Sequence, residues 1–495
     1  MRTHRFLAFD LGAESGRAVL GVLENDRLSV RELHRFANGP VRFLGHEHWD
    51  LFRLFEDIKT GARLCAQEAG VQPDSLAVDA WGVDFGLAAE DGSLLGLPFA
   101  YRDSRTAGAM EYFFQRMPRE DVYGLTGVQF MPFNTLFQLA AMVRDRSSLL
   151  EAASRLLFMP DLFHYLLTGL MSSEFTIATT SQIYNPRRHA WSGEIMAALG
   201  LPESLLPDVA APATVLGPIT AETAAATGLR SGIPVTATAS HDTGSAVAAV
   251  PAEGGDWAYI SSGTWSLLGI ETPEPIINGR TLKLNFTNEG GLGGRIRFLK
   301  NVTGLWLLQQ CRKSWESAGG TSLDYAELVQ AAEAAPAFRI LIDPDDPDFL
   351  NPPDMTQAIR AYARRTRQPE PDSVPVFVRC ILESLALKYR RVLDELRQVS
   401  PRPIKKIHVI GGGSQNALLC RFTAEAAGLP VAAGPAEAAA SGNILGQALA
   451  LGAVHSLEEI RAVMRNSFKL ETYQPCDSPA WEKAYGRFQE ILETG

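Results

Sequence analysis

A polar segment near the middle of the chain carries the strongest candidate for a general base. Residues 240–243, Ser-His-Asp-Thr, follow an apolar run and precede small residues that favour a helix. A carboxylate at a strand end can orient an alcohol and accept its proton as the oxygen attacks phosphorus. Asp242 is therefore the candidate base of a phosphoryl transfer. The competing interpretation makes Asp242 the N-cap of the helix, with Thr243 and Ser245 in its first turn.

Two short turns rich in Gly, Ser and Thr occupy corresponding places in the two halves of the chain. The first lies within residues 6–20, around Gly12 and Gly16, and the second lies within 257–269, around Gly263. Each pattern predicts an apolar strand, a tight turn and a second apolar strand. The tip of such a hairpin exposes N–H groups and hydroxyls that suit phosphate oxygens. The two turns together predict a clamp on a polyphosphate.

The commoner nucleotide loops are missing from the sequence. No G-x-x-x-x-G-K-[ST] pattern occurs. Two stretches begin the G-x-G-x-x-G pattern, at Gly291 and at Gly411, but Ile296 and Asn416 stand where the third glycine should be. A dinucleotide-binding Rossmann site is therefore not expected.

The first glycine turn is flanked by charge. Asp10 directly precedes it, and a carboxylate beside a phosphate is repulsive unless a cation lies between them. We expect Mg²⁺ there, held by Asp10 directly or through water. Glu14 poses the same problem and should face metal-bound water or solvent. Arg17 should pair with Glu14 or contact phosphate.

Four further patterns have both a binding and a structural interpretation. Residues 411–416 offer N–H groups to an adenosine at a helix start, or form an ordinary turn. Residues 81–85 place a Trp and an Asp beside a glycine, as sugar sites do, or lie in a core around a bulge. Lys300-Asn301 contacts substrate or caps the helix that follows. His46-Glu47-His48 has two ligands on one strand face but no third ligand nearby, so no metal site is predicted.

The elements that position these residues mix strands with helices in each half. Apolar periodicity predicts strands at 76–80, 233–240 and 406–410, and helices at 51–69, within 105–200, and at 376–398, 417–427 and 436–451. Gly442 and Gly446 inside the last helix suggest close packing or ligand approach. We expect two α/β domains, residues 1–250 and 251–495, with a cleft between them that holds the ligand.

Composition narrows the class of protein. The 495 residues are 46% hydrophobic and 21% charged, with a net charge of −10 that argues against nucleic acid as a partner. The five cysteines are scattered without a C-x-x-C pair, which fits a reducing compartment: Cys65, Cys311, Cys380, Cys420 and Cys476. With no signal peptide and no long apolar run, we expect a cytoplasmic protein that does not enter a membrane.

Taken together, these residues resemble the rhamnulokinase group of the FGGY carbohydrate kinases. The resemblance runs from about residue 6 to residue 450 and rests on segments 10–17, 81–85, 101–105, 240–243, 261–265, 300–309 and 411–416. It implies a two-lobed ribonuclease H-like fold of the actin and hexokinase type, with ATP and a sugar in the interdomain cleft. Glu14 departs from the pattern, which has a second serine in this turn, and it removes a hydroxyl that could contact phosphate.

The resemblance also implies an activity and a set of site residues. The activity is transfer of the γ-phosphate of ATP to O1 of L-rhamnulose, with Mg²⁺ and with Asp242 as the proton acceptor. The implied sugar contacts are Gly82, His241, Asp242, Thr243 and Asn301. The implied ATP contacts are Ala13, Glu14, Ser15, Gly16, Arg17, Thr264, Gln309 and Gly412. The first domain would hold the sugar and one phosphate turn, and the second domain the other turn and the adenosine.

Two alternatives stay open from the sequence. An FGGY kinase for another ketose, such as L-fuculose or L-xylulose, would differ only in the sugar pocket near 81–85, His241 and Asn301. A non-catalytic, ATP-gated regulatory protein of the actin-like superfamily would need no general base in the cleft. It would hydrolyse ATP slowly and independently of sugar.

Overall fold

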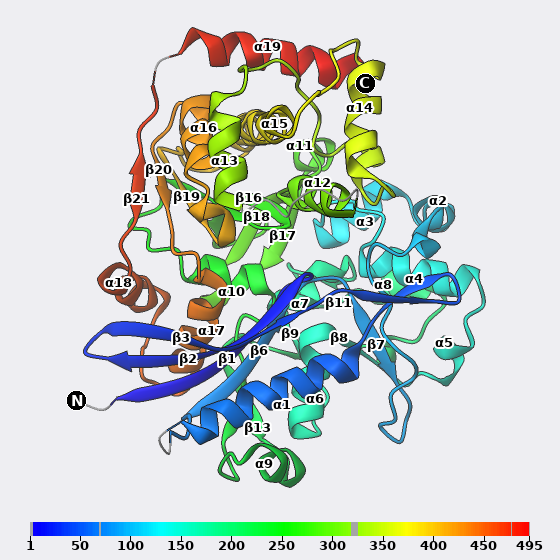
Figure 1. Cartoon of the computed structure of the whole chain (residues 1–495). Helices are drawn as coiled ribbons and strands as arrows, with labels where there is room; N and C mark the ends of the chain where they lie inside the picture. The colour runs from blue at the N-terminus through cyan, green and yellow to red at the C-terminus, as the bar shows by residue number, and fades with distance from the viewer. Residues whose placement is uncertain (1–2, 69–70, 318–324, 477, 495) are drawn as a thin grey trace. The chain divides into compact units, whose positions relative to one another are not determined.

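The chain folds into two compact units, each with a mixed sheet and covering helices (Figure 1). The computed structural model describes residues 3–68, 71–317, 325–476 and 478–494. Unit 1 comprises Met1–Pro251, Glu271–Leu299 and Ala438–Phe468, and unit 2 comprises Ala252–Ile270, Lys300–Glu437 and Lys469–Gly495. The units therefore differ from two consecutive halves, because residues 271–299 and 438–468 return to unit 1.

A six-stranded sheet organises unit 1. Its order is β13-β14-β6-β1-β2-β3, with bounds β1 (His4–Leu11), β2 (Ser15–Glu24), β3 (Arg27–Ala37), β6 (Ser75–Ala80), β13 (Thr214–Pro218) and β14 (Pro234–Ala237). Strand β1 pairs with β2 as an antiparallel hairpin, which confirms the first predicted strand–turn–strand. Strands β1, β6 and β14 run parallel, so their carboxyl ends meet at one edge of the sheet. Ligands bind outside such an edge in many α/β proteins.

Helices cover both faces of this sheet, and the alternation of side chains decides which residues face which helix. On one face, Gly61 of α1 (Leu51–Gln67) lies against Phe9 and Ala18. On the other face, Ile444 of α17 (Ala438–Ala450) fills the space beside Gly21. Because neighbours along a strand point to opposite faces, Asp10, next to Phe9, is on the α17 side.

Helix α17 also packs closely against α10 (Asp242–Ala248). A Cβ built on Gly442 would lie only 1.8 Å from the backbone oxygen of Ser245. A Cβ on Gly446 would lie 3.0 Å from Cβ of Thr238. The close packing expected from these two glycines is confirmed.

The rest of unit 1 is largely helical, as predicted for residues 105–200. Its helices are α2 (Ala109–Phe114), α3 (Arg119–Thr126), α4 (Thr135–Arg144), α5 (Ser148–Ala152), α6 (Met159–Thr168), α7 (Phe175–Ala178), α8 (Gly193–Leu199), α9 (Ala221–Thr227), α11 (Gly279–Lys283) and α18 (Leu457–Ser467). Its short strands are β4 (Pro40–Phe43), β5 (His46–Trp49), β7 (Phe85–Ala88), β8 (Arg155–Phe158), β9 (Ser173–Glu174), β10 (Tyr184–Asn185), β11 (Ala190–Trp191), β12 (Val209–Ala210) and β17 (Thr287–Gly290). Phe85, Phe113, Phe137 and Phe158 share one apolar core between these helices and the β7–β8 hairpin.

Unit 2 repeats the hairpin-and-parallel-strand arrangement of unit 1. Strand β15 (Trp257–Ser262) is antiparallel to β16 (Trp265–Thr272) and parallel to β19 (Lys406–Ile410). Strands β20 (Val431–Ala433) and β21 (Glu471–Tyr473) follow in order, and β18 spans Ile296–Thr303. The helices are α12 (Trp306–Ser317), α13 (Tyr325–Ala334), α14 (Met355–Arg365), α15 (Val374–Arg397), α16 (Ala417–Ala427) and α19 (Pro479–Thr494). The second predicted strand–turn–strand is therefore confirmed.

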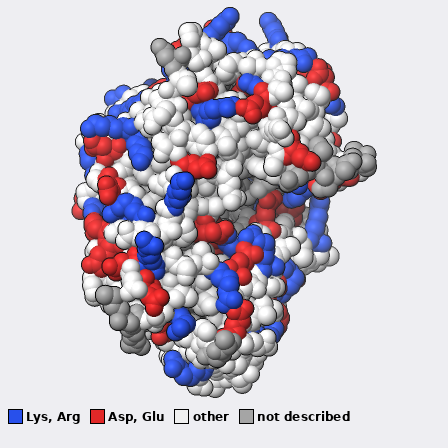
Figure 2. All heavy atoms as spheres, turned by 60° about the vertical axis from the view of Figure 1, so that its left-hand side comes forward, with Lys and Arg blue, Asp and Glu red and all other residues white. Residues whose placement is uncertain are grey.

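Charge is finely mixed over the surface seen in Figure 2. Lys and Arg side chains there stand between Asp and Glu side chains. In the part of the chain that the structure describes, no helix has both the length and the apolarity needed to cross a membrane.

Candidate active site

The first glycine turn is fixed by hydrogen bonds at the tip of the β1–β2 hairpin. Gly12 N donates to Ser15 O at 2.9 Å, and the Asn38 side chain donates to Gly12 O at 2.7 Å. A Cβ on Gly16 would lie 2.2 Å from the Phe36 ring, so only glycine allows this ring to pack there. Residues 12–15 are partly exposed at the tip, where a ligand can reach them.

Asp10 and Arg17 form a cross-strand ion pair beside this turn. They face each other in the β1–β2 register, and Arg17 donates to Asp10 Oδ2 from Nε at 3.0 Å and from Nη2 at 2.7 Å. Opposed charges on neighbouring strands stabilise each other in this way. Asp10 is therefore one identified partner of Arg17.

A second carboxylate, Asp79, lies beside Asp10 in the parallel β1–β6 register. Asn443 of α17 donates to Asp79 Oδ2 at 2.6 Å, and Oδ1 is buried without a hydrogen-bond partner among the described residues. Burial raises the pKa of Asp79, and the nearby carboxylates of Asp10 and Asp242 raise it further against the hydrogen bond from Asn443. Three carboxylates therefore gather at the carboxyl edge of the sheet.

Asp242 is the first residue of α10, and His241 is its N-cap. The interpretation of Asp242 as the N-cap is therefore wrong. Its Oδ1 accepts from Thr243 N and from Thr243 Oγ1 at 3.1 Å, and lies 3.4 Å from His241 Nε2. Its Oδ2 has no such partner in the described parts of the chain, and 27% of the side chain is exposed.

The surroundings of Asp242 make its carboxylate more basic than usual. Burial raises the pKa of Asp242, the nearby Asp10 adds to this, and His241 opposes it. A carboxylate with a raised pKa takes up a proton more readily, which suits a general base.

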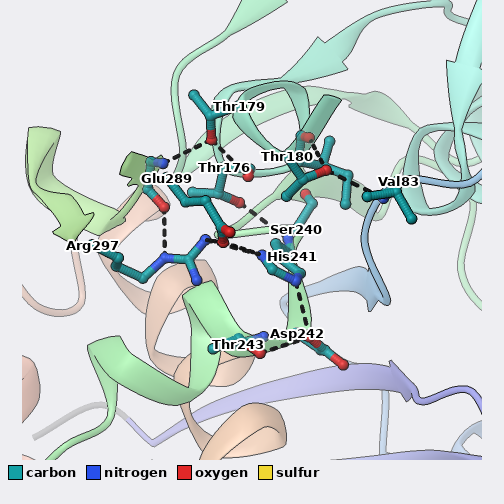
Figure 3. A network of polar contacts seen from close by, with 12 residues as sticks. Val83, Thr176, Thr179, Thr180, Ser240, His241, Asp242, Thr243, Glu289 and Arg297 are labelled. Carbon is teal, nitrogen blue, oxygen red and sulfur yellow. Dashed lines mark hydrogen bonds and ion pairs between the residues drawn. The ribbon is translucent and has the colours of Figure 1, made fainter. Parts of the chain in front are cut away.

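Gly82 and residues 240–243 are brought together by backbone contacts. Ala80 N donates to Ser240 O at 2.9 Å, and a Cβ on Gly82 would lie 3.4 Å from His241 Nε2. His241 N donates to Thr176 Oγ1 at 3.0 Å, which fixes the main chain just before Asp242. Figure 3 shows Asp242 at the edge of this network, with one carboxylate oxygen pointing away from it.

In unit 2, the expected ATP residues gather around the second glycine turn. Gly263 N donates to Trp265 O at 2.8 Å, and Thr264 O accepts from Trp306 N, at the start of α12, at 3.2 Å. Gln309 lies in the next turn of α12, and its Oε1 is buried without a hydrogen-bond partner among the described residues. Gly412 is exposed in the loop after β19.

Glycines in that loop permit a close approach to β15. A Cβ on Gly413 would lie 2.0 Å from Ser262 Oγ, and Gly411 has a positive φ of 80°. The loop ends at Asn416, whose side chain caps α16 by accepting from Leu419 N at 3.0 Å. The strand, turn and helix expected at 406–427 are therefore present.

Comparison with known proteins places the whole chain in one family. Residues 5–249 match the N-terminal domain of the FGGY family of carbohydrate kinases, and residues 258–451 match its C-terminal domain. The rhamnulokinase of Bacteroides thetaiotaomicron (strain VPI-5482) is 50% identical over 487 residues, which cover 98% of this chain and 99% of that protein. The chain belongs to the FGGY family of carbohydrate kinases. It is an enzyme of the sugar kinase class.

Other comparisons agree with this FGGY assignment. The rhamnulokinase of Pectobacterium carotovorum subsp. carotovorum (strain PC1) is 43% identical, with 100% of this chain and 97% of that protein covered. A ligand-bound xylulose kinase from Lactobacillus acidophilus has a TM-score of 0.80 at 16% identity, over 99% of this chain and 98% of that chain. A Plasmodium falciparum glycerol kinase with ADP has a TM-score of 0.74 at 14% identity, with 99% and 98% covered. The two-domain kinase fold expected from the sequence is confirmed.

The sugar-contact interpretation of Trp81 and Asp84 in this FGGY chain is wrong. Both side chains are buried, and Asp84 Oδ2 accepts from the indole N–H of Trp81 at 3.0 Å and of Trp49 at 2.6 Å. Tyr101 N and Gln138 Nε2 also donate to Asp84, at 3.1 and 2.9 Å. The carboxylate is fully used within the core, so only Gly82 of this segment stays a sugar-contact candidate.

The segment Lys300-Asn301 does not cap a helix. Both residues lie in β18, and α12 begins five residues later, at Trp306. Lys300 Nζ donates to Glu395 Oε2 at 2.7 Å, which anchors it within unit 2. Asn301 belongs to unit 2, whereas Gly82, His241 and Asp242 belong to unit 1, and it stays a predicted sugar contact.

The two histidines of residues 46–48 have partners of their own. His46 Nδ1 lies 3.1 Å from Asp103 Oδ1, and His48 Nδ1 lies 3.3 Å from Leu97 O. Within the described ranges, no three His, Cys, Asp or Glu side chains are grouped to hold a metal ion.

Sequence reasoning missed several residues of the unit 1 site. Asp79 and Asn443 are separated by more than three hundred residues, and Glu289 and Arg297 lie in a stretch whose only sequence pattern is its glycines. A buried arginine in an apolar strand has no signal of its own in a single sequence. The one available signal for Asn443 was its place beside Gly442, in a helix expected to pack closely.

Proposed function

We propose that this protein transfers the γ-phosphoryl group of ATP to O1 of L-rhamnulose, giving L-rhamnulose 1-phosphate and ADP. Membership of the FGGY carbohydrate kinases supports a sugar acceptor. Relatives that bear the name rhamnulokinase, at 50% and 43% identity over nearly the whole chain, support L-rhamnulose as that sugar.

The observation that carries the proposed chemistry is the state of the Asp242 carboxylate. Thr243 donates to Oδ1 and His241 Nε2 lies 3.4 Å from it, while Oδ2 is left for another group. A sugar hydroxyl that donates to Oδ2 is oriented for attack, and its proton passes to Asp242 as the O–P bond forms. Phosphorylation requires nothing further of this residue than orientation and uptake of one proton.

The phosphate-binding part of the proposal rests on the two hairpin turns. Residues 13–17 in unit 1 and Thr264 in unit 2 would donate to phosphate oxygens, with Gln309 and Gly412 contacting the remainder of ATP. Fixed donors stabilise the charge that spreads over the transferred group in the transition state. Glu14 has no hydroxyl to add to this set, so Ser15 and the backbone would serve there.

The carboxylates of unit 1 fit a magnesium ion. Hard oxygen ligands are what Mg²⁺ prefers, and it commonly binds one or two carboxylates together with water and phosphate oxygens. Asp10 is the residue that we propose to hold it, directly or through water, and Asp79 lies beside Asp10 in the β1–β6 register. When bound, Mg²⁺ neutralises charge on the phosphates.

A ketose panel tests the proposed substrate. ADP release from the full chain with ATP and Mg²⁺ is measured with L-rhamnulose, L-fuculose, L-xylulose and no sugar, and products are identified by mass and by NMR. We expect the highest kcat/KM with L-rhamnulose and phosphate on O1. A higher kcat/KM with another ketose would replace the substrate, and equal ADP release without sugar would favour the regulatory ATPase.

A further inference from the structure

One arginine beside the site has no contact with water. The Arg297 side chain is 0% exposed, and it forms an ion pair with Glu289, whose Oε2 lies 3.2 Å from Nη2. Arg297 Nε also donates to Gly290 O at 2.7 Å. Such a buried cation is costly unless it is paired and hydrogen-bonded. The pair therefore fixes the position of the guanidinium closely.

The same guanidinium contacts the histidine of the site. Arg297 Nη2 lies 2.9 Å from His241 Nδ1, as Figure 3 shows. Guanidinium stays protonated in proteins and has no acceptor atom. At this distance His241 Nδ1 must therefore be the acceptor, and it carries no proton.

The competing arrangement would place a proton on Nδ1 and direct it at Glu289. Glu289 Oε2 lies 3.4 Å from Nδ1, which is longer than the usual N–H···O range of about 2.7–3.2 Å. A protonated Nδ1 would also direct its hydrogen toward the hydrogens of Arg297 Nη2. The geometry thus favours acceptance from Arg297 over donation to Glu289.

We propose that Arg297 and Glu289 are positioning residues that hold His241 as a neutral imidazole with its proton on Nε2. The partner of one ring nitrogen sets which nitrogen carries the proton. The Nε2 proton then points toward Asp242 Oδ1, at 3.4 Å, and toward the space that Gly82 leaves open. This inference rests on the proposed function of Asp242 as base.

The consequence for the reaction is that the two oxygens of the Asp242 carboxylate have separate roles. Thr243 donates to Oδ1, and the Nε2–H group of His241 faces the same oxygen at 3.4 Å, so favourable charge lies on the Oδ1 side and Oδ2 stays directed at the sugar hydroxyl. A His241 with its proton on Nδ1 would instead offer a lone pair to Oδ1, which repels it. Loss of the Arg297–Glu289 pair should therefore lower kcat more than it weakens sugar binding.

Nitrogen-15 NMR of the full chain tests the tautomer without any substrate. The protein is labelled at its nine histidines, and a His241→Asn variant identifies the His241 signals by their loss. We expect a proton-coupled Nε2 and an uncoupled Nδ1 in the unsubstituted protein. A proton on Nδ1 there would overturn the inference by itself, whatever the fate of the variants.

Kinetic variants test the role of the pair. Arg297→Met should lower kcat for the preferred ketose roughly ten- to hundredfold, by analogy with the partners that orient metal-binding histidines, and should move the proton off Nε2 in the NMR spectrum. Arg297→Lys restores a cationic donor and should recover part of kcat. Unchanged kcat and unchanged His241 signals in Arg297→Met would also overturn the inference.

Arg461→Met is the matched control. Arg461 and Glu271 form another ion pair within unit 1, with side chains 11% and 8% exposed, and nothing places them in the site. This variant should lose thermal stability while kcat and the His241 signals stay unchanged. A loss of kcat equal to that of Arg297→Met would show that any broken buried pair has this effect and would refute a positioning role.

If no ketose is phosphorylated at all, the proposed function fails, while the NMR result still decides the tautomer.

Discussion

Asp84 and Asp242 are both carboxylates near strand ends of unit 1, yet their surroundings give them different roles. Asp84 accepts hydrogen bonds from two indoles, a main-chain N–H and Gln138, and none of its side chain is exposed. Asp242 has one oxygen occupied and one available. The number of donors around a carboxylate, rather than its residue type, separates a structural acid from a base.

Replacing Asp84 by Asn should destabilise the protein without touching the reacting groups. One of the two carboxylate oxygens of Asp84 becomes an NH₂ group that faces the Gln138 donor. A buried unsatisfied group costs roughly 1–3 kcal/mol of unfolding free energy. Urea unfolding of the two proteins measures this difference. A variant as stable as the parent would contradict the role given to these hydrogen bonds.

The parent protein and Asp84→Asn also give a prediction for the pH dependence of the unfolding free energy. Burial raises the pKa of Asp84 to about 6 from its ordinary 3.8, against the hydrogen bonds of Gln138, Trp49 and Trp81. The folded state therefore binds this proton more tightly, and the resulting stability is present at low pH and lost as pH rises through about 6. The gap in unfolding free energy between the parent and Asp84→Asn should narrow from about pH 4 to about pH 6 and change little above about pH 7. A gap that widens over this range would contradict the assigned shift.

Gly82→Ala should act on the sugar alone. Its Cβ would lie 3.3 Å from Thr180 and 3.4 Å from His241 Nε2, where the sugar is proposed to sit. We expect KM for the ketose to rise by about tenfold, since one methyl in a fitted pocket is worth about 1–3 kcal/mol, with KM for ATP unchanged. Gly124→Ala in α3, where an added Cβ meets nothing within 4 Å, is the control and should leave both constants unchanged.

Residue types indicated Asp242 as a candidate base, and the family resemblance implied the residues grouped with it. Gly82, His241, Asp242 and Thr243 do come together in unit 1. The partners of His241 could not be predicted, because Glu289 and Arg297 reach it only through the fold. For Trp81 and Asp84 the sequence left a sugar contact and a core position both open, because an exposed aromatic beside a carboxylate and a buried one have the same sequence. The fold decides for the core.

Among the elements, helix α17 is the one that most directly fixes the position of the base. It packs against α10, whose first residue is Asp242, and Gln447 on α17 binds Ser75 Oγ at 2.6 Å and Leu7 O at 3.1 Å. Asn443 on the same helix binds Asp79. A helix from near the C-terminal end of the chain thus ties the start of α10 to strands β1 and β6.

Gly442→Ala tests this contact. The added Cβ would lie 1.8 Å from Ser245 O, so α17 and α10 must separate, and overpacking of this kind costs roughly 1–3 kcal/mol or more. We expect a lower Tm. Gly486→Ala in α19 is the control, since a Cβ there meets nothing within 4 Å and alanine favours a helix. A Tm for Gly442→Ala at or above that of the parent would contradict the tight α10–α17 contact.

The elements themselves were predicted well where the signal is local. Alternation and turn residues predicted both hairpins. Helical periodicity predicted the bounds of α1, α15 and α16 to within a few residues. The place of α17 was not predictable, because nothing within residues 436–451 says which sheet the helix will cover. Only its two glycines, Gly442 and Gly446, indicated that another element would pack closely against this helix.

At the scale of the molecule, two units carry the same core arrangement of a hairpin and a parallel strand. The sequence indicated this repetition through its two glycine turns. It did not indicate that residues 271–299 and 438–468 would return to unit 1, because such returns depend on long-range packing. The prediction that each half carries its own part of the ligand set stays a prediction.

The most direct measurement of the central claim is phosphoryl transfer by Asp242→Asn, with ATP binding measured on the same sample. The substitution keeps the shape of the side chain and removes its ability to take a proton. We predict that kcat with the preferred ketose falls by roughly two to four decades, while the Kd for ATP changes little. Turnover close to that of the parent would contradict a role for Asp242 as the base.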